Sequence, residues 1–154
     1  MPERRYATAL ILAGSGALLG GALLFQHVGG LAPCEMCLWQ RWPHVAALAL
    51  GLVAWATRHN RVVLGLAALA VLASAAIGYF HAGVEYHWWA GPSACSAAPM
   101  TGSVADITAM VLATPLIRCD AAAWTLFGIS MAGYNALLSS LIGGASLWLT
   151  LRRK

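Results

Sequence analysis

Charged residues are scarce in this sequence, and their scarcity excludes most soluble folds. Of its 154 residues only 9% are Asp, Glu, Lys or Arg, whereas 60% are hydrophobic. Ordinary globular domains contain roughly 25% charged and roughly 45–50% apolar residues. A small domain exposes much of its surface, and so few charges could not cover it. Intrinsic disorder is excluded too, because disordered chains combine low hydrophobicity with high net charge. The sequence therefore predicts an integral membrane protein.

The sequence also lacks an extended basic segment, although its net charge is +4. The basic residues form small groups between apolar runs rather than a continuous face, which argues against nucleic-acid binding. No internal repeat and no soluble domain is visible. We therefore expect a single membrane domain over residues 1–154 and no nucleic-acid partner.

Four uncharged apolar runs are the candidate membrane spans. The first is long enough, at ~1.5 Å per residue, to cross ~30 Å of hydrocarbon. The fourth is the longest, and we expect it either to include an interfacial turn or to tilt strongly. Glycines are scattered through the runs, as is usual where membrane helices approach closely. The predicted fold is an all-α, four-helix membrane bundle with spans at about 6–28, 42–57, 62–83 and 122–151.

The basic residues lie almost entirely on one side of the predicted bundle. All except Arg41 and Arg118 precede the first span, lie in the turn between the second and third, or end the chain. By the positive-inside rule both termini are cytoplasmic. The loops at about 29–41 and 84–121 then face the opposite compartment. A cleaved signal peptide over residues 1–28 is the competing interpretation, but the run is long and lacks a clear small-residue cleavage site.

All four cysteines lie in the two outward loops. Cys34 and Cys37 have the Cys-x-x-Cys spacing of thiol–disulfide catalysts, because positions i and i+3 of a helix share a face. Pro33 suits a helix start there, and the positive end of the helix dipole favours a thiolate. Cys95 and Cys119 lie in the longer loop. Two cysteines per loop in an oxidising compartment indicate one pair per loop.

Metal binding and structural disulfides are the alternative interpretations of four cysteines. A structural zinc site usually combines two close pairs, whereas Cys95 and Cys119 are 24 positions apart. Haem attachment requires His directly after the second cysteine, and position 38 is Leu. A Cys95–Cys119 disulfide could contribute ~3 kcal/mol by closing a long loop. The short Cys34–Cys37 ring removes little chain entropy, so this pair is the better redox candidate and we expect no metal.

Arg41 follows Cys37 by one helical turn, on the side that the positive-inside rule disfavours. It is either an arginine that extends its charge to the membrane surface or a fixed cation beside a thiolate or a reducible carbonyl. If the helix continues, His44 shares this face, although Pro43 can disturb the register. The nearby tryptophans are typical of an interfacial belt. Histidines near this boundary are more typical of interfacial residues than of catalytic acids: His27, His44, His81 and His87.

The longer outward loop contains one amphipathic stretch. Val104, Ile107 and Val111 fall near one face of a helix, as in short helices that lie on a membrane surface. We expect a surface helix there. Such a loop is long enough to carry Cys95 to another protein or back to the first loop.

Together these motifs resemble the bacterial DsbB family, membrane oxidants that regenerate the disulfide of periplasmic DsbA-type proteins. The resemblance covers nearly the whole chain, including the four spans, their topology and both cysteine pairs. The matching segments are residues 25–28, residues 33–37 with Arg41, residues 83–87, and the loop that contains Cys95 and Cys119. Vitamin K epoxide reductase relatives also combine four-helix bundles with Cys-x-x-Cys pairs, but their motif order differs.

The resemblance implies a role for each of these segments. Cys34 and Cys37 correspond to the redox pair next to the quinone, and Arg41 corresponds to the arginine at that site. His87 falls near a histidine associated with the same quinone site. The implied electron acceptor is ubiquinone or menaquinone from the membrane quinone pool.

The second cysteine pair corresponds to the shuttling pair of the family. Cys95 and Cys119 would take electrons from a periplasmic DsbA-like thioredoxin-fold protein, and Cys95 would form the mixed disulfide with it. The implied protein is a protein-dithiol:quinone oxidoreductase of the bacterial inner membrane that supports disulfide bond formation, with both termini cytoplasmic. A membrane scaffold with two inert disulfides is the non-enzymatic alternative.

Overall fold

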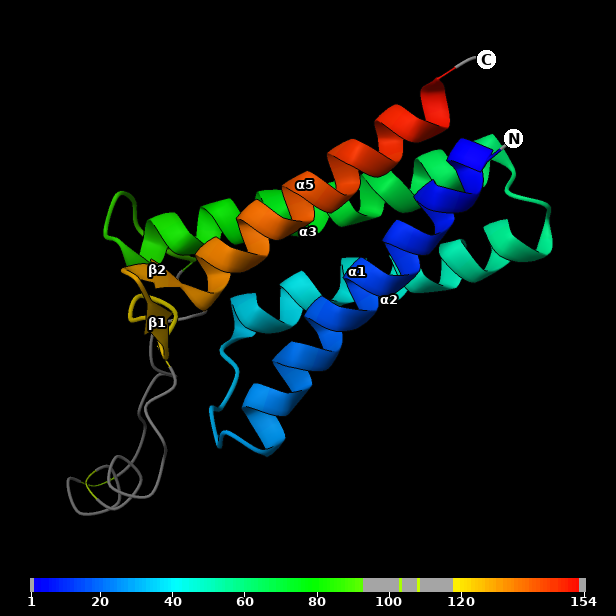
Figure 1. The fold of residues 1–154 in the computed structure, drawn as a ribbon. Coiled ribbons are helices and arrows are strands. Elements are labelled where there is room, and N and C mark those ends of the chain that lie inside the picture. Colours follow the sequence, from blue (N-terminus) through cyan, green and yellow to red (C-terminus); the bar gives the residue numbers. More distant parts are fainter. Residues whose placement is uncertain (1, 93–102, 104–107, 109–117, 153–154) are drawn as a thin grey trace.

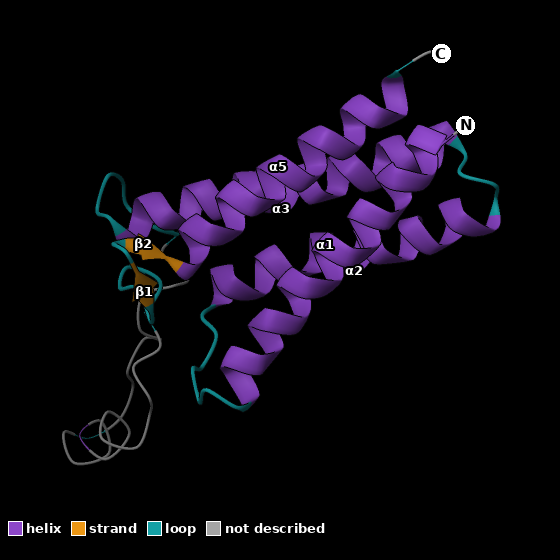
Figure 2. Ribbon diagram, in the orientation of Figure 1, coloured by secondary structure: helices purple, strands orange, loops and turns teal. Residues whose placement is uncertain are grey.

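Four helices make up nearly all of the computed structural model, which describes residues 2–92, 103, 108 and 118–152 (Figure 1). Two strands of two residues each are the only strands in this part of the chain (Figure 2). The expected all-α, four-helix architecture is confirmed. The surface helix predicted around Ile107 and the cysteine at position 95 lie outside the described residues. The helices are α1 (Pro2–His27), α2 (Glu35–Ala56), α3 (Arg61–Glu85) and α5 (Met131–Leu151), and the strands are β1 (Thr125–Leu126) and β2 (Ile129–Ser130).

Helix α3 lies at the centre of the packing. It makes its most extensive contacts with α5 and α2, while α1 packs against α2 and α5. Both chain termini and the turn between α2 and α3 lie at one end of the bundle, which we call the terminal end (Figure 1). The β1–β2 hairpin and the connection from α1 to α2 lie at the opposite end, which we call the loop end.

The outer surface of the bundle is apolar, as expected of a protein surrounded by lipid. Helices α1 and α3 are long and apolar enough to cross a membrane. A soluble protein buries most of an apolar helix, whereas only 17% of the apolar window of α1 is buried here. Large apolar side chains are exposed along the other two helices as well, among them Leu52, Trp55, Leu141 and Trp148.

Small residues allow the helices to approach closely. A Cβ atom added to Gly78 of α3 would lie 3.0 Å from the Ala136 nitrogen and 3.1 Å from the Ala132 oxygen of α5. Such small-residue contacts are typical of membrane bundles, where close backbone packing replaces the hydrophobic effect between helices. Towards the terminal end the core is apolar and formed by Ile11, Ala47, Ala54, Leu64, Ala67, Ala68 and Val71.

Helix α2 begins directly after the first cysteine of the Cys-x-x-Cys motif. The Cys34 side chain caps the helix by accepting a hydrogen bond from the Cys37 amide. Pro43 lies inside the helix, and α2 continues through it to Ala56. The helical register from Cys37 to His44 is therefore kept, despite the disturbance that the proline could have caused.

The long uncharged run at the end of the chain is divided between a hairpin and a helix. Phe127 and Gly128 have φ values of 50° and 77°, as the tight turn of a two-residue hairpin requires. The Tyr86 hydroxyl at the end of α3 accepts a hydrogen bond from the Ser130 amide and donates one to the Gly128 carbonyl. Helix α5 then begins at Met131, so the turn accounts for the excess length of the run.

Candidate functional site

The Cys-x-x-Cys pair lies at the N-terminus of α2, at the loop end of the bundle. The two sulfur atoms are 3.0 Å apart, and Cys34 donates its S–H to the Cys37 sulfur. The Cys37 amide donates in turn to the Cys34 sulfur at 3.3 Å. Both thiols are reduced in this structure. The pair is therefore arranged as a dithiol whose sulfurs already face each other.

The two thiols of the pair differ in acidity, because one donates to the other. Both precede the span predicted to begin at residue 42. The S–H donated to Cys37, together with burial, raises the pKa of Cys34 to about 12. The same hydrogen bond lowers the pKa of Cys37. Cys37 is thus the more acidic thiol of this reduced pair, while Cys34 stays protonated at neutral pH.

Cys119, although distant in sequence, packs onto this pair. It is 3% exposed and forms one buried cluster with Cys34, Met36 and Val84, against which Cys37 also packs. Cys119 is preceded by Arg118, which makes a two-bond ion pair with Asp120 at 2.8 and 2.7 Å. Arg118 is one of the two basic residues that do not follow the predicted positive-inside pattern, and Asp120 partly compensates its charge. The structure therefore brings one cysteine of the second pair to the first pair.

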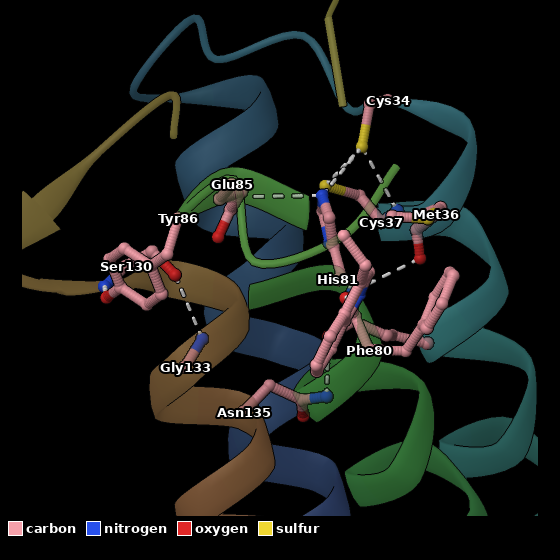
Figure 3. A network of polar contacts seen from close by, with 12 residues as sticks. Cys34, Met36, Cys37, Phe80, His81, Glu85, Tyr86, Ser130, Gly133 and Asn135 are labelled. Atoms are coloured by element: carbon pink, nitrogen blue, oxygen red, sulfur yellow. Dashed lines mark hydrogen bonds and ion pairs between the residues drawn. The ribbon is translucent and has the colours of Figure 1, made fainter. Parts of the chain in front are cut away.

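His81 of α3 is buried beside the Cys-x-x-Cys pair (Figure 3). The sequence did not indicate this position. It is 1% exposed, and its Nε2 lies 3.5 Å from the Cys34 sulfur. The same Nε2 lies 3.7 Å from Oε1 of Glu85, one helical turn further along α3. On its other side, Nδ1 of His81 is 2.8 Å from Nε2 of Gln40. The sequence predicted an interfacial histidine here, whereas His81 is buried inside the bundle.

A chain of hydrogen bonds continues from Gln40 into the bundle. Asn135 of α5 donates from Nδ2 to Oε1 of Gln40 at 2.8 Å and to the Ser74 hydroxyl at 3.1 Å. The Asn135 Oδ1 lies 3.0 Å from Nε2 of His44 and accepts from the Ser139 hydroxyl at 3.0 Å. Three helices thus contribute to one polar network inside the bundle. Groups of this kind are expensive in a membrane and mark functional sites by default.

A cavity of about 350 Å³ opens beside the Cys-x-x-Cys pair. Most of its wall is apolar and comes from α1, α2, α5 and the hairpin region. Cys37 and Arg41 both line it, one helical turn apart. The cavity is within the size range of small-molecule sites, which are mostly apolar with a few convergent polar groups. The other polar residues in its wall are Gln26, Gln40, His44, Glu85, Tyr134 and Asn135.

The Arg41 side chain is held against α1. Its guanidinium donates hydrogen bonds to the Gln26 side chain and to the Ala22 carbonyl. An arginine that only reaches for the membrane surface needs no such partners inside the bundle. The geometry therefore favours a fixed cation in the cavity wall over the alternative of a surface anchor.

The remaining residue predicted for this site is His87, and the structure gives it a different position. His87 is exposed, has a φ of 60°, and lies in the turn after α3. It is absent from the described wall of the cavity. The neighbouring Trp89 stacks on Phe80 and donates from its indole nitrogen to the Phe80 carbonyl at 2.9 Å.

The site also contains a group of potential metal ligands. The ligand atoms of Cys34, Cys37 and His81 all lie within 4.8 Å of one another. Cysteine spacing could not reveal this group, because the histidine comes from another helix. A closed structural zinc site has four ligands. The pair could contribute to such a site only as a dithiol, since a disulfide offers no thiolate.

Comparison with known proteins identifies the family. The model of the family "Disulfide bond formation protein DsbB" matches residues 4–149. A disulfide bond formation protein B of Polaromonas naphthalenivorans is 31% identical, with 96% of this chain and 92% of the relative covered. A disulfide bond formation protein B of Azoarcus sp. is 28% identical, with 99% of this chain and 95% of the relative covered. No solved structure gives a significant match. The chain therefore belongs to the DsbB family of membrane proteins, and its role is redox chemistry in disulfide bond formation.

Proposed function

We propose that this protein is a protein-dithiol:quinone oxidoreductase. It reoxidises a periplasmic DsbA-like thioredoxin-fold protein and passes the electrons to ubiquinone or menaquinone. The electrons travel from the partner to Cys95–Cys119, then to Cys34–Cys37, and then to the quinone. The protein lies in the bacterial inner membrane with both termini in the cytoplasm.

The observation that carries this proposal is the cavity whose wall includes both Cys37 and Arg41. A quinone is apolar and planar with two carbonyl oxygens, so it suits an apolar cavity with few polar groups. Two buried polar atoms in residues of this wall have no hydrogen-bond partner within the described structure, namely Nδ1 of His44 and Oε2 of Glu85. Nε2 of His44 faces the Asn135 oxygen and carries the ring hydrogen, so Nδ1 is an acceptor, as is the carboxyl oxygen. The hydroxyl groups of a reduced quinone could donate to them, and an unpaired buried polar atom costs about 1–3 kcal/mol. The residues present therefore fit such a ligand.

Within this site, Cys37 would donate electrons and Arg41 would stabilise negative charge. The lowered pKa of Cys37 makes it the thiolate of the pair, and it is the cysteine that lines the cavity. The Arg41 guanidinium can make charge-assisted hydrogen bonds to a reduced quinone oxygen. In the overall reaction two thiols become one disulfide, and two electrons and two protons pass to the quinone.

Electron transfer between the two cysteine pairs is supported by the packing of Cys119 on Cys34. A Cys119 thiolate, released when the partner binds Cys95, would attack the Cys34 sulfur and expel Cys37 as the leaving thiolate. The result is a Cys34–Cys119 disulfide, and the electron pair of the broken Cys34–Cys37 bond stays on the Cys37 sulfur. The departing Cys37 thiolate would lie in the cavity wall with the Arg41 cation, which favours its negative charge.

The energetics of the proposed partner explain why a quinone is needed. DsbA is an established reference at about −120 mV, whereas structural disulfides lie below about −300 mV. Passing electrons from such a donor to an ordinary disulfide would therefore be uphill by ~180 mV, or ~8 kcal/mol for two electrons. A stronger acceptor held in the bilayer is required to oxidise such a donor.

The decisive experiment is to mix the purified protein with a reduced DsbA-type protein and a soluble quinone and to follow thiol loss. We expect catalytic loss of the partner's thiols that requires both the quinone and the membrane protein. A scaffold with two inert disulfides would give no quinone-dependent reoxidation. Menaquinone and ubiquinone analogues, compared in the same assay, identify the preferred acceptor.

The orientation has its own test. After mild reduction, a membrane-impermeant thiol reagent applied to intact spheroplasts should label the cysteines of both loops. Labelling only after the membrane is opened would contradict the proposed topology and place the thiols in the cytoplasm.

A further inference from the structure

The hydrogen bonds around His81 determine which of its ring nitrogens carries a proton. Gln40 can offer only an N–H from its Nε2, so the His81 Nδ1 at 2.8 Å must accept. The assignment of the Gln40 amide is fixed by Asn135, whose Nδ2 donates to the Gln40 oxygen. Neutral His81 therefore carries its hydrogen on Nε2, the nitrogen that faces the Cys34 sulfur at 3.5 Å.

The acceptors around this N–H are few. The Cys34 sulfur and Oε1 of Glu85 lie at 3.5 and 3.7 Å from Nε2, and the Cys119 backbone is a further partner of the ring. His81 is 1% exposed, so water does not compete strongly for the hydrogen. In Figure 3 the imidazole stands between Glu85 and the two sulfurs. The Cys34 sulfur is thus one of three acceptors for this hydrogen, and it becomes a stronger one when negative charge develops on it.

We propose that His81 is a catalytic hydrogen-bond donor to the Cys34 sulfur when this sulfur leaves a Cys34–Cys119 disulfide. The inference rests on the proposed exchange between the two cysteine pairs. It assigns to His81 the step that restores the Cys95–Cys119 disulfide, and it assigns to Gln40 and Asn135 the positioning of the imidazole.

The step balances as an ordinary thiol–disulfide exchange. The Cys95 thiolate attacks the Cys119 sulfur, a Cys95–Cys119 bond forms and the Cys119–Cys34 bond breaks. The electron pair of the broken bond goes to the Cys34 sulfur, which receives the hydrogen bond from His81. Cys95 is oxidised into the disulfide as Cys34 is reduced, so the step has no net redox change.

This step needs assistance because Cys34 leaves as a buried sulfur. Its side chain is 4% exposed, so water can do little to stabilise the charge that develops on the sulfur. The other residues of its cluster, Met36 and Val84, are apolar. A donor aimed at Cys34 stabilises the charge that develops on it.

The test uses the full-length protein with Cys37→Ser, which retains only the three cysteines of this step. A chemical oxidant forms the Cys34–Cys119 disulfide, because Cys37 is not there to be expelled. The Cys34–Cys119 species and its conversion to Cys95–Cys119 are followed by rapid alkylation and peptide mass spectrometry. His81→Leu removes the donor and should slow the conversion roughly 10- to 150-fold, the range for one hydrogen bond to a charged group. His81→Gln keeps an N–H at similar reach and should recover much of the rate.

Two further variants separate catalysis from folding. Gln40→Met leaves His81 in place but frees the ring to adopt either tautomer, so we expect a rate between those of His81→Leu and the parent. His59→Asn changes a histidine at the terminal end, where asparagine tolerates the left-handed backbone, and should leave the rate unchanged.

The outcomes distinguish the two proposals. If the oxidant forms no Cys34–Cys119 disulfide in the Cys37→Ser protein, the two sulfurs do not meet, so the exchange between the pairs is wrong and the role of His81 falls with it. If it forms but converts equally fast in His81→Leu, the exchange stands and the donor role of His81 is overturned. Equal slowing by His81→Leu and His81→Gln would also overturn it, because the donor would then not matter.

Discussion

The loop end and the terminal end of the bundle are built from different chemistry, although the same helices run through both. At the terminal end the core is apolar, and a typical polar contact is a single pair, the Thr8 hydroxyl with the His59 ring at 2.7 Å. At the loop end three helices contribute to a continuous network that reaches from Cys34 to Asn135. Buried polar groups are costly in a membrane unless they are satisfied. Their concentration at one end therefore indicates where the reaction takes place, while the other end holds the helices together.

Removing one thiol from the loop end should have the largest effect. We expect Cys119→Ser to abolish turnover and to trap a mixed disulfide between Cys95 and the thioredoxin-fold partner, because the resolving thiol is missing. Non-reducing electrophoresis and mass spectrometry detect the adduct. Arg58→Ala at the terminal end is the matched control and should retain activity. Recovering no adduct from properly inserted protein would instead favour a structural disulfide.

The two thiols of the loop end should differ strongly in their reactivity with iodoacetamide. Because the pKa of Cys34 is about 12 and that of Cys37 is lowered, Cys37 should carry at least ~1000-fold more thiolate at neutral pH. Peptide mass spectrometry of the reduced protein, in a series from pH 6 to pH 10, measures both rates. Cys37 should react at lower pH than Cys34, and Cys34 only as the pH approaches its raised pKa. Similar profiles for both thiols would show that the hydrogen bond between them does not set their acidity.

Arg41 should affect the quinone step and leave the exchange between cysteine pairs nearly unchanged. Loss of one charge-assisted hydrogen bond costs about 1.5–3 kcal/mol, so Arg41→Ala should lower quinone utilisation roughly 10- to 150-fold. Arg41→Lys keeps the charge but loses the planar fork, and we expect a smaller loss. Steady-state kinetics with varied quinone measure both. If Arg41→Ala only lowered expression, the arginine would be a membrane anchor after all.

Glycine substitutions should distinguish close helix packing from open surface, with the smallest effect. Gly78→Ala forces a Cβ against the α5 backbone, which cannot move aside easily, and should destabilise the protein by about 1–3 kcal/mol. Gly65→Ala, on the same helix nearer the terminal end, meets nothing within 4 Å and should be neutral or stabilise by up to about 1 kcal/mol. Thermal unfolding in detergent measures the difference. Equal effects would contradict the close approach of α3 and α5.

The features that sequence could predict are local ones. The scarcity of charge and the four apolar runs predicted the all-α membrane fold. The spacing of Cys34, Cys37 and Arg41 predicted that they share a helix face, because such spacing is a property of one helix. The cavity receives both Cys37 and Arg41. The roles of these residues in the reaction stay predictions.

The features that sequence reasoning missed depend on contacts between helices. His81 touches a cysteine 47 positions away, and Asn135 reaches a glutamine 95 positions away. No local pattern encodes such distances, and a lone histidine in an apolar run has many ordinary explanations. One signal was available, since His81 and Glu85 are one turn apart and an ionisable pair inside a membrane helix marks function by default. His87, chosen from the resemblance, lies in an exposed turn instead.

The burial of Cys34 and Cys119 has a consequence for the rest of the cell's thiols. These side chains are 4% and 3% exposed, so a small thiol or an unfolding secreted protein has little access to them. Thiol–disulfide exchange requires an in-line approach to sulfur, and a site that cannot be approached cannot be short-circuited. A powerful oxidant can then remain in the membrane without oxidising proteins indiscriminately. Substrate choice would then be left to Cys95, the cysteine that the partner is proposed to attack.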